Sequence, residues 1–233
     1  KAKLAAEVEI TAHQNDEYTT EQKDIKYYEI KEVPENKDGK MVVKVTKDEK
    51  GKEIVEDTIY VNYYYRKLTF NLKVDKTIAS VIVNGQETTI NGNLGKVEVH
   101  RKELSTANVK VVYKIKVTND SELTGKANVL ENIPSGMTMK LDNNPGWAIN
   151  ETTASIETDE IKPGESREYQ VVLGWQNGDN NVGTKTNIAN IITENEAGFN
   201  EKEINDNESK ADLIVAVGTG EVPYVAIAGS ILM

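Results

Sequence analysis

Three polar residues, Lys76, Glu131 and Asn187, interrupt the apolar faces of segments whose residues alternate in the manner of β-strands. If each strand is half-buried, these side chains point into the core, where an unpaired charge is costly. We therefore predict that the three side chains meet. Their apolar neighbours are Phe70, Leu72, Val74 and Ile78 beside Lys76, Val129 and Ile133 beside Glu131, and Ala189 and Ile191 beside Asn187.

The chemistry open to such a group is an intramolecular amide bond. Burial lowers the pKa of a lysine and raises the pKa of a carboxylic acid. A neutral Lys76 amine can attack the carboxamide of Asn187, while Glu131 relays protons and polarises the carbonyl. The alternatives are a core salt bridge between Lys76 and Glu131 with Asn187 hydrogen-bonded nearby, or strand edges where these side chains reach water.

The composition excludes most other chemistry. The 233 residues include no cysteine, which removes disulfides, thiolate nucleophiles and cysteine-ligated zinc, and only two histidines, His13 and His100. A net charge of −10 argues against a nucleic-acid partner, because phosphate binding needs a basic surface. We predict no cofactor, no metal and no enzymatic activity beyond the self-directed bond. A glycosidase would need paired carboxylates in a cleft, and nothing in the sequence assigns them.

The elements that position the three residues are predicted to be strands. Asn84-Gly85 separates two alternating runs and is a strong signal for a hairpin turn, and no segment shows a capped helical stripe. Strands separated by turns without helices predict antiparallel β-sandwiches of the immunoglobulin-like or prealbumin-like kind. The further predicted strands are 97–100, 109–117, 127–133, 169–175, 188–193 and 213–217.

The chain is predicted to divide into three parts. Residues 1–66, with strands at 26–34, 41–45 and 54–65, are short for a complete sandwich and suggest the C-terminal part of a domain. Residues 67–217 form a whole sandwich. Residues 218–233 begin with the turn-favouring residues Gly, Thr, Gly and Pro and end in an uncharged run. This pattern predicts a linker and the start of a truncated anchor, with a buried final strand as the alternative.

Residues 67–217 resemble the conserved-repeat and fimbrial isopeptide-forming domains of Gram-positive, clostridia-like cell-surface proteins. The resemblance implies that Lys76 and Asn187 form an internal isopeptide bond and that Glu131 stands where the family usually has a catalytic aspartate in a D-x-L-P context. The motifs that carry it are Phe70-Asn-Leu-Lys-Val-Asp-Lys76, Tyr113-Lys-Ile-Lys-Val-Thr-Asn119, Val129-Leu-Glu-Asn-Ile-Pro-Ser-Gly136, Gly146-Trp147, Ile161-Lys-Pro-Gly-Glu-Ser166 and Asn187-Ile-Ala-Asn-Ile191.

Residues 1–66 are similar to the end of a SpaA-like, prealbumin-like repeat. Tyr28-Glu-Ile-Lys-Glu-Val-Pro34 resembles its Y-x-I-x-E-x-x-x-P strand with the proline one position early, which implies that Glu32 matches the catalytic glutamate. Asn62 is the candidate for the bond-forming asparagine of this second, incomplete site. Its lysine partner would lie on a first strand that precedes the sequence.

The family resemblance implies a stalk or pilin-like adhesin on the bacterial surface, held at its C-terminus by a membrane or cell-wall anchor. Its partners would be neighbouring domains of the same protein, with the membrane reached only through that anchor. An adhesive module for host matrix or glycan is the alternative function. The aromatic residues Tyr63, Tyr64, Tyr65, Trp147 and Trp175 are considered as a carbohydrate platform, but core packing and interdomain contact are favoured for them. Loops 177–181 and 205–208 are considered as calcium ligands.

Overall fold

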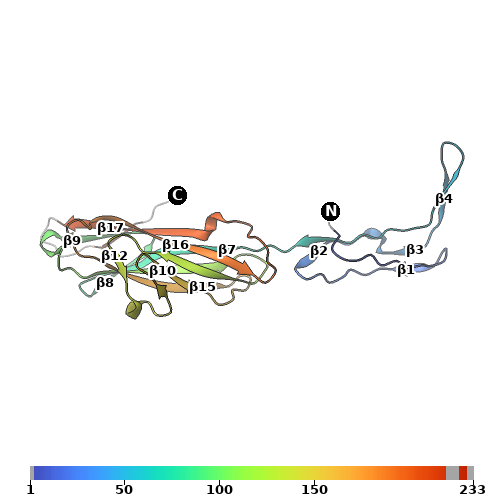
Figure 1. Cartoon of the computed structure of the whole chain (residues 1–233). Coiled ribbons are helices and arrows are strands. Elements are labelled where there is room, and N and C mark those ends of the chain that lie inside the picture. The colour runs from blue at the N-terminus through green and yellow to red at the C-terminus, as the bar shows by residue number, and fades with distance from the viewer. Residues whose placement is uncertain (1–2, 219–225, 230–233) are drawn as a thin grey trace. The chain divides into compact units, whose positions relative to one another are not determined.

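The computed structural model describes residues 3–218 and 226–229, and the chain forms two compact units, Lys1–Leu68 and Thr69–Met233. The division lies two residues beyond the end of the first predicted part. Both units are built from β-strands, as Figure 1 shows, and the helical segments in the described residues are single 3-10 turns. The all-β class predicted from the alternating runs is therefore confirmed.

The second unit is a sandwich of two sheets. The five-stranded sheet has the order β12-β15-β10-β7-β8, and the seven-stranded sheet has the order β13-β14-β11-β16-β17-β9-β18. The pairing is antiparallel except between β17 and β9, which run parallel. The strands are β7 (Leu72–Val83), β8 (Gln86–Gly92), β9 (Leu94–His100), β10 (Val109–Asn119), β11 (Gly125–Asn132), β12 (Met137–Met139), β13 (Ala148–Ile149), β14 (Thr153–Glu157), β15 (Ser166–Trp175), β16 (Gly183–Asn195), β17 (Glu208–Gly218) and β18 (Ala226–Gly229).

The core lies between the two sheets and follows the alternation of the strands. Every second residue of β7 from Leu72 to Ile78 is buried, and β10 shows the same pattern. The alternation of β7 shifts at Ala79, where the strand has one more residue than β10 opposite it, so the face that points inward changes. The β7–β8 hairpin turns at Asn84 and Gly85, which have φ angles of 49° and 88°, as the dipeptide predicts.

Where the short strand β12 ends, the side chain of Asn144 takes over the hydrogen bonds to the edge of β15. Asn144 is 1% exposed, and its Nδ2 donates to the carbonyl of Val172 at 2.9 Å while its Oδ1 accepts from the Val172 N–H at 2.6 Å. The carboxamide thus replaces the peptide group that a longer β12 would offer. This satisfies two backbone groups that would otherwise be unpaired.

The first unit has no comparable core. Its strands form three two-stranded sheets, and none of residues 3–68 is buried. The strands are β1 (Glu17–Thr19), β2 (Tyr28–Glu32), β3 (Asp38–Lys40), β4 (Lys44–Lys47), β5 (Glu53–Glu56) and β6 (Tyr64–Lys67). The predicted single strand 54–65 is wrong, because its two ends pair with different partners, β5 with β4 and β6 with β2.

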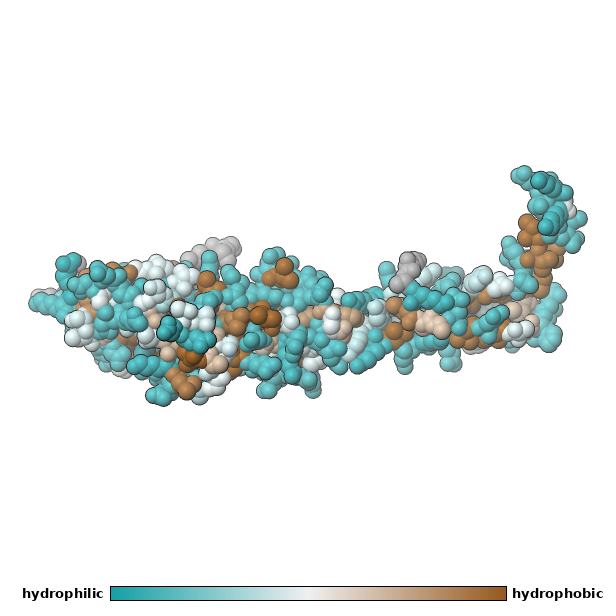
Figure 2. Space-filling model, viewed as in Figure 1, coloured by the Kyte–Doolittle hydropathy of each residue, from teal (hydrophilic) through white to brown (hydrophobic). Residues whose placement is uncertain are grey.

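Large apolar side chains on the first unit remain exposed instead of packing together. The β4–β5 hairpin carries Val45 and Val55 directly opposite each other, with exposed fractions of 58% and 55%. Apolar residues are visible on this hairpin in Figure 2. A two-stranded ribbon offers only one neighbour to each strand, so its side chains gain little burial.

The C-terminal prediction for 218–233 falls mostly on residues outside those described. Within it, Ala226–Gly229 forms β18, an edge strand that pairs antiparallel with β9. This pairing corresponds to the alternative of a final strand at these four positions. Across the described residues, no helical segment has the length and apolar character that a bilayer crossing requires.

Candidate functional site

The three polar residues predicted to meet come from both sheets of the second unit. Lys76 lies in the middle of β7, in the five-stranded sheet, whereas Glu131 and Asn187 lie on the adjacent strands β11 and β16 of the other sheet. Their exposed fractions are 1%, 0% and 0%. Each occupies an inward position of its strand, because the alternation that buries the apolar neighbours buries these side chains as well.

Lys76 and Glu131 are in direct contact across the sandwich. Lys76 Nζ donates to Glu131 Oε2 at 2.6 Å, and both side chains are fully enclosed. Asn187 Nδ2 donates to the backbone carbonyl of Asn132 at 2.9 Å, which fixes the carboxamide beside the end of β11. The remaining acceptors, Glu131 Oε1 and Asn187 Oδ1, are buried and have no hydrogen-bond partner.

The electrostatics of the buried pair favour its uncharged forms. Burial lowers the pKa of Lys76, against the opposing effect of the Glu131 charge. Burial likewise raises the pKa of Glu131, against the smaller effects of Lys76 and of the Asn187 amide. The two shifts bring the proton affinities of the amine and the carboxylate closer together. Burial therefore moves Lys76 toward the neutral form in which an amine is nucleophilic.

Tyr113 is a fourth member of the site that the sequence analysis did not single out as functional. It lies on β10 next to β7, is 0% exposed, and has its ring centroid 4.9 Å from Lys76 Nζ. Its hydroxyl has no hydrogen-bond partner. The available signal was a hydroxyl on an apolar face, between Val111 and Ile115, but tyrosine is common in cores and the pattern alone gives it no role.

The second predicted site, at Glu32 and Asn62, lacks the environment of the first. Glu32 pairs with Tyr64 at the end of β2, Asn62 lies outside the strands, and both side chains are exposed. Desolvation is what shifts a lysine and a carboxylic acid toward neutrality. The described residues 3–68 do not supply that desolvation at either position.

The aromatic residues weighed for ligand binding differ in burial, because Tyr63, Tyr64 and Tyr65 are only half-buried whereas the two tryptophans are in the core. Trp147 and Trp175 are each 5% exposed, and their indole N–H groups donate to the carbonyls of Gln170 and Asn181. Core packing, the favoured reading of these tryptophans, is what the structure shows. Among the described residues, no group of three or more histidine, aspartate or glutamate side chains could hold a metal ion.

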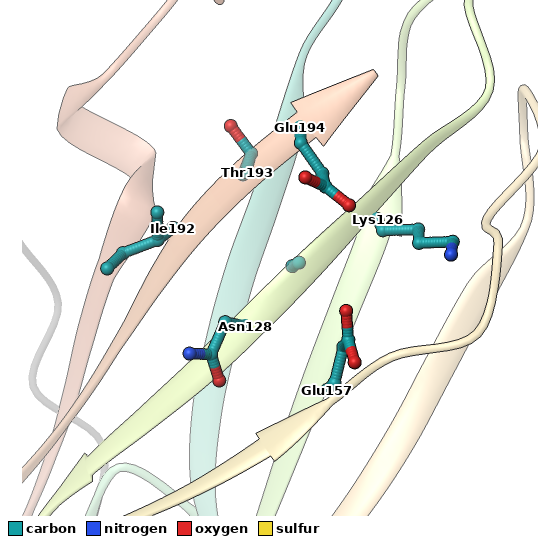
Figure 3. A pocket seen from close by; sticks show the side chains of 7 residues that line it. Lys126, Asn128, Glu157, Ile192, Thr193 and Glu194 are labelled. Carbon is teal, nitrogen blue, oxygen red and sulfur yellow. The ribbon is translucent and has the colours of Figure 1, made fainter. Parts of the chain in front are cut away.

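Two hollows lie on the outer face of the seven-stranded sheet, away from Lys76. Figure 3 shows the first, where side chains of β11, β14 and β16 such as Lys126, Glu157 and Glu194 surround an open space of about 130 Å³. The second, of about 330 Å³, is lined by Leu130, Asn132, Ala148, Asn150, Thr153, Ala154, Ser155 and Asn190. Neither lining includes an aromatic side chain, and neither reaches the buried site.

Comparison with known proteins gives distant structural similarity only. No family model matches the chain, and no curated protein matches it. The major pilin subunit of Bacillus cereus, BcpA, is similar over 84% of this chain and 54% of its own, with 16% identity and a TM-score of 0.40. The CARDB domain of the PF1109 protein from Pyrococcus furiosus covers 64% of this chain and 90% of its own, at 14% identity and a TM-score of 0.34.

The bacterial hydrophobin BslA is similar at the same level, covering 64% of this chain and 96% of its own, with 15% identity and a TM-score of 0.31. Because these sequence identities and TM-scores are low, the fold is assigned from the observed strand order and burial and not from the similar structures. The chemistry rests on the buried site.

Proposed function

We propose that this chain is a structural stalk segment of a bacterial cell-surface protein of the pilin or adhesin type, stiffened by an amide bond that forms spontaneously between Lys76 and Asn187. The observation that carries the proposal is the complete burial of Lys76, Glu131 and Asn187 at the centre of the second unit. A fold that needed only packing would gain nothing from an ion pair there, because apolar residues of similar volume are often as stabilising.

The reaction needs no group from outside the chain. With the proton on Glu131, the Lys76 amine attacks Cγ of Asn187, the Nζ–Cγ bond forms, and the carbonyl electron pair moves onto Oδ1. Glu131 then transfers a proton from Nζ to Nδ2. The Cγ–Nδ2 bond breaks and ammonia leaves, so one C–N bond replaces another and the chain loses about 17 Da.

The positions of the strands explain what such a bond would do mechanically. Lys76 lies on the first strand of the second unit, between β10 and β8, and Asn187 lies on β16, between β11 and β17. The bond would join interior strands of the two sheets and close a loop of about 110 residues, contributing on the order of 4–5 kcal/mol on the loop-entropy model. Tension entering at β7 would pass directly to β16, and most of the sandwich would carry none of it.

We also propose an extracellular location, with neighbouring domains of the same protein as partners, attachment through a C-terminal anchor, and no catalysis beyond the protein's own bond. The absence of cysteine supports a cross-link made by amide chemistry instead of sulfur.

Intact-mass measurement of the purified chain tests the bond. We expect a mass about 17 Da below that of the sequence, because one ammonia is released. Lys76→Ala and Asn187→Ala should each abolish the loss and lower the melting temperature. Lys73→Ala, on the exposed face of the same strand, is the matched control and should keep the loss. Folded wild-type protein at its full sequence mass would contradict the proposal and leave the core salt bridge as the role of these residues.

A further inference from the structure

The hydroxyl of Tyr113 is buried in the core without a hydrogen-bond partner. Tyr113 lies on β10 between Val111 and Ile115, and all three residues are 0% exposed. A phenylalanine would fill the same space without the penalty of an unpaired hydroxyl. Buried polar groups without partners are rare in native proteins, and one beside a reactive group calls for a physical reason.

Tyr113 lies beside the lysine of the buried site. The Tyr113 ring lies beside Lys76 Nζ in the five-stranded sheet, at 4.9 Å. The opposite sheet has the order β11-β16-β17, and the charges of Glu131 on β11 and Asp212 on β17 both act on the tyrosine. Lys76 Nζ contacts Glu131 Oε2 at 2.6 Å, and Asn187 lies on β16, the strand next to the one that carries Glu131, so Tyr113 and Asn187 both lie around this ion pair.

The unpaired atoms around the site are complementary. Six buried side-chain atoms without partners occur in the described residues, and the Tyr113 hydroxyl is the only hydroxyl among them. The others are oxygens of carboxylates or carboxamides, including Asn187 Oδ1 and Glu131 Oε1. The site therefore holds one hydroxyl that can donate and acceptors that lack a donor.

We propose that the Tyr113 hydroxyl donates a hydrogen bond to Oδ1 of Asn187 when that oxygen takes up negative charge during the attack by Lys76. This role rests on the proposed amide bond and adds an oxyanion donor to it. Such donors are aimed at the oxygen of the tetrahedral intermediate and not at the ground-state carbonyl, so the hydroxyl is expected to be unpaired before reaction. Burial also raises the pKa of Tyr113, so the phenol stays protonated and can act as a hydrogen-bond donor.

The rate of ammonia loss tests this role. The chain is synthesised in a short cell-free pulse, and its intact mass is followed over time. Tyr113→Phe keeps the ring against Lys76 and removes only the hydroxyl, and we expect bond formation to slow about 10²-fold, as for loss of one oxyanion donor elsewhere. Tyr169→Phe on β15, a half-buried tyrosine of the same sheet, is the matched control and should react at the wild-type rate.

The outcomes separate this proposal from the proposed function. Wild-type protein that never loses ammonia overturns the amide bond and the Tyr113 role together. Wild-type protein that reacts while Tyr113→Phe reacts equally fast overturns only the role of the hydroxyl. In that case a slow Tyr113→Leu variant would assign the effect to the aromatic ring beside Lys76.

A stability measurement distinguishes catalysis from packing. In a Lys76→Ala background, where no bond can form, Tyr113→Phe should leave the melting temperature unchanged or raise it, because an unpaired buried hydroxyl is removed. A clear fall in melting temperature in that background would show a structural hydrogen bond and overturn the proposal.

Discussion

At the scale of single residues, the site depends on how burial changes proton affinities. Lys76 and Glu131 are both enclosed, and burial moves the pKa of each toward its neutral form. The same two residues in water would be an ion pair with an unreactive ammonium. The fold therefore supplies the shift in proton affinity that the proposed amide bond requires, while the residue types supply only the functional groups.

Removing Lys76 should expose the effect of burial on Glu131 as a pH-dependent stability. In Lys76→Ala, the nearby charge that lowers the pKa of Glu131 is gone, so its folded pKa lies further above the unfolded value near 4.5. The folded state then holds a proton that the unfolded state releases above about pH 4.5. Stability should fall as pH rises through that window, by up to about 1.4 kcal/mol per pH unit.

Urea unfolding between pH 5 and pH 8 measures this slope, with the double variant Lys76→Ala/Glu131→Gln as the control. The control has no carboxyl group to ionise at position 131, so its unfolding midpoint should change less with pH. Equal slopes in the two variants would contradict a raised pKa for Glu131.

At the scale of elements, the sandwich depends on close approaches that residue patterns do not show. Gly125 begins β11 against the ring of Phe70, which is 2% exposed. A Cβ on residue 125 would lie 2.3 Å from Phe70 Cε2 and 2.9 Å from the carbonyl oxygen of Glu194. The absence of a side chain lets β11 lie against the aromatic ring.

Gly125→Ala should therefore destabilise the second unit by about 1–3 kcal/mol, because an added methyl group must displace a buried ring or the backbone of β16. The unfolding midpoint in urea measures the change. Gly218→Ala is the control, since the nearest atom to its added Cβ is Glu98 Cβ at 3.7 Å. A midpoint for Gly125→Ala within error of the control would show that the ring moves aside at no cost.

At the scale of the whole molecule, the two units differ in how much core they contain. The second unit has two sheets and a continuous set of buried side chains, whereas none of the described residues 3–68 is buried. Regions with few buried apolar contacts open with low free energy, and proteases and hydrogen exchange report such opening.

Limited proteolysis should accordingly cut the first unit and spare the second. We expect early cleavage within residues 3–68 and a resistant fragment beginning near Thr69, identified by mass spectrometry. Hydrogen exchange should likewise be fast in β4 and β5 and slow in β7 and β10. Equal protection of the two units would contradict the difference in burial between them.

The sequence by itself determined the longer strands of the second unit, whereas the short strands β12, β13 and β14 were not predicted. Alternation marked β7, β10, β11 and β16, and the Asn84-Gly85 turn marked the first hairpin, because these signals depend on neighbours along the chain. The same alternation showed that Lys76, Glu131 and Asn187 face inward. It failed for 54–65, where two short strands with different partners follow each other and no periodicity shows the change of partner.

Only the tertiary structure decided which inward residues meet. The contact of Lys76 with Glu131 and the position of Asn187 beside Asn132 depend on the order of strands in two facing sheets, which alternation does not encode. The same holds for Tyr113, whose place beside Lys76 follows from the pairing of β10 with β7. Residues far apart in sequence become one buried site with shifted pKa values because packing two sheets removes water from between them, and that removal is a property of the assembled fold.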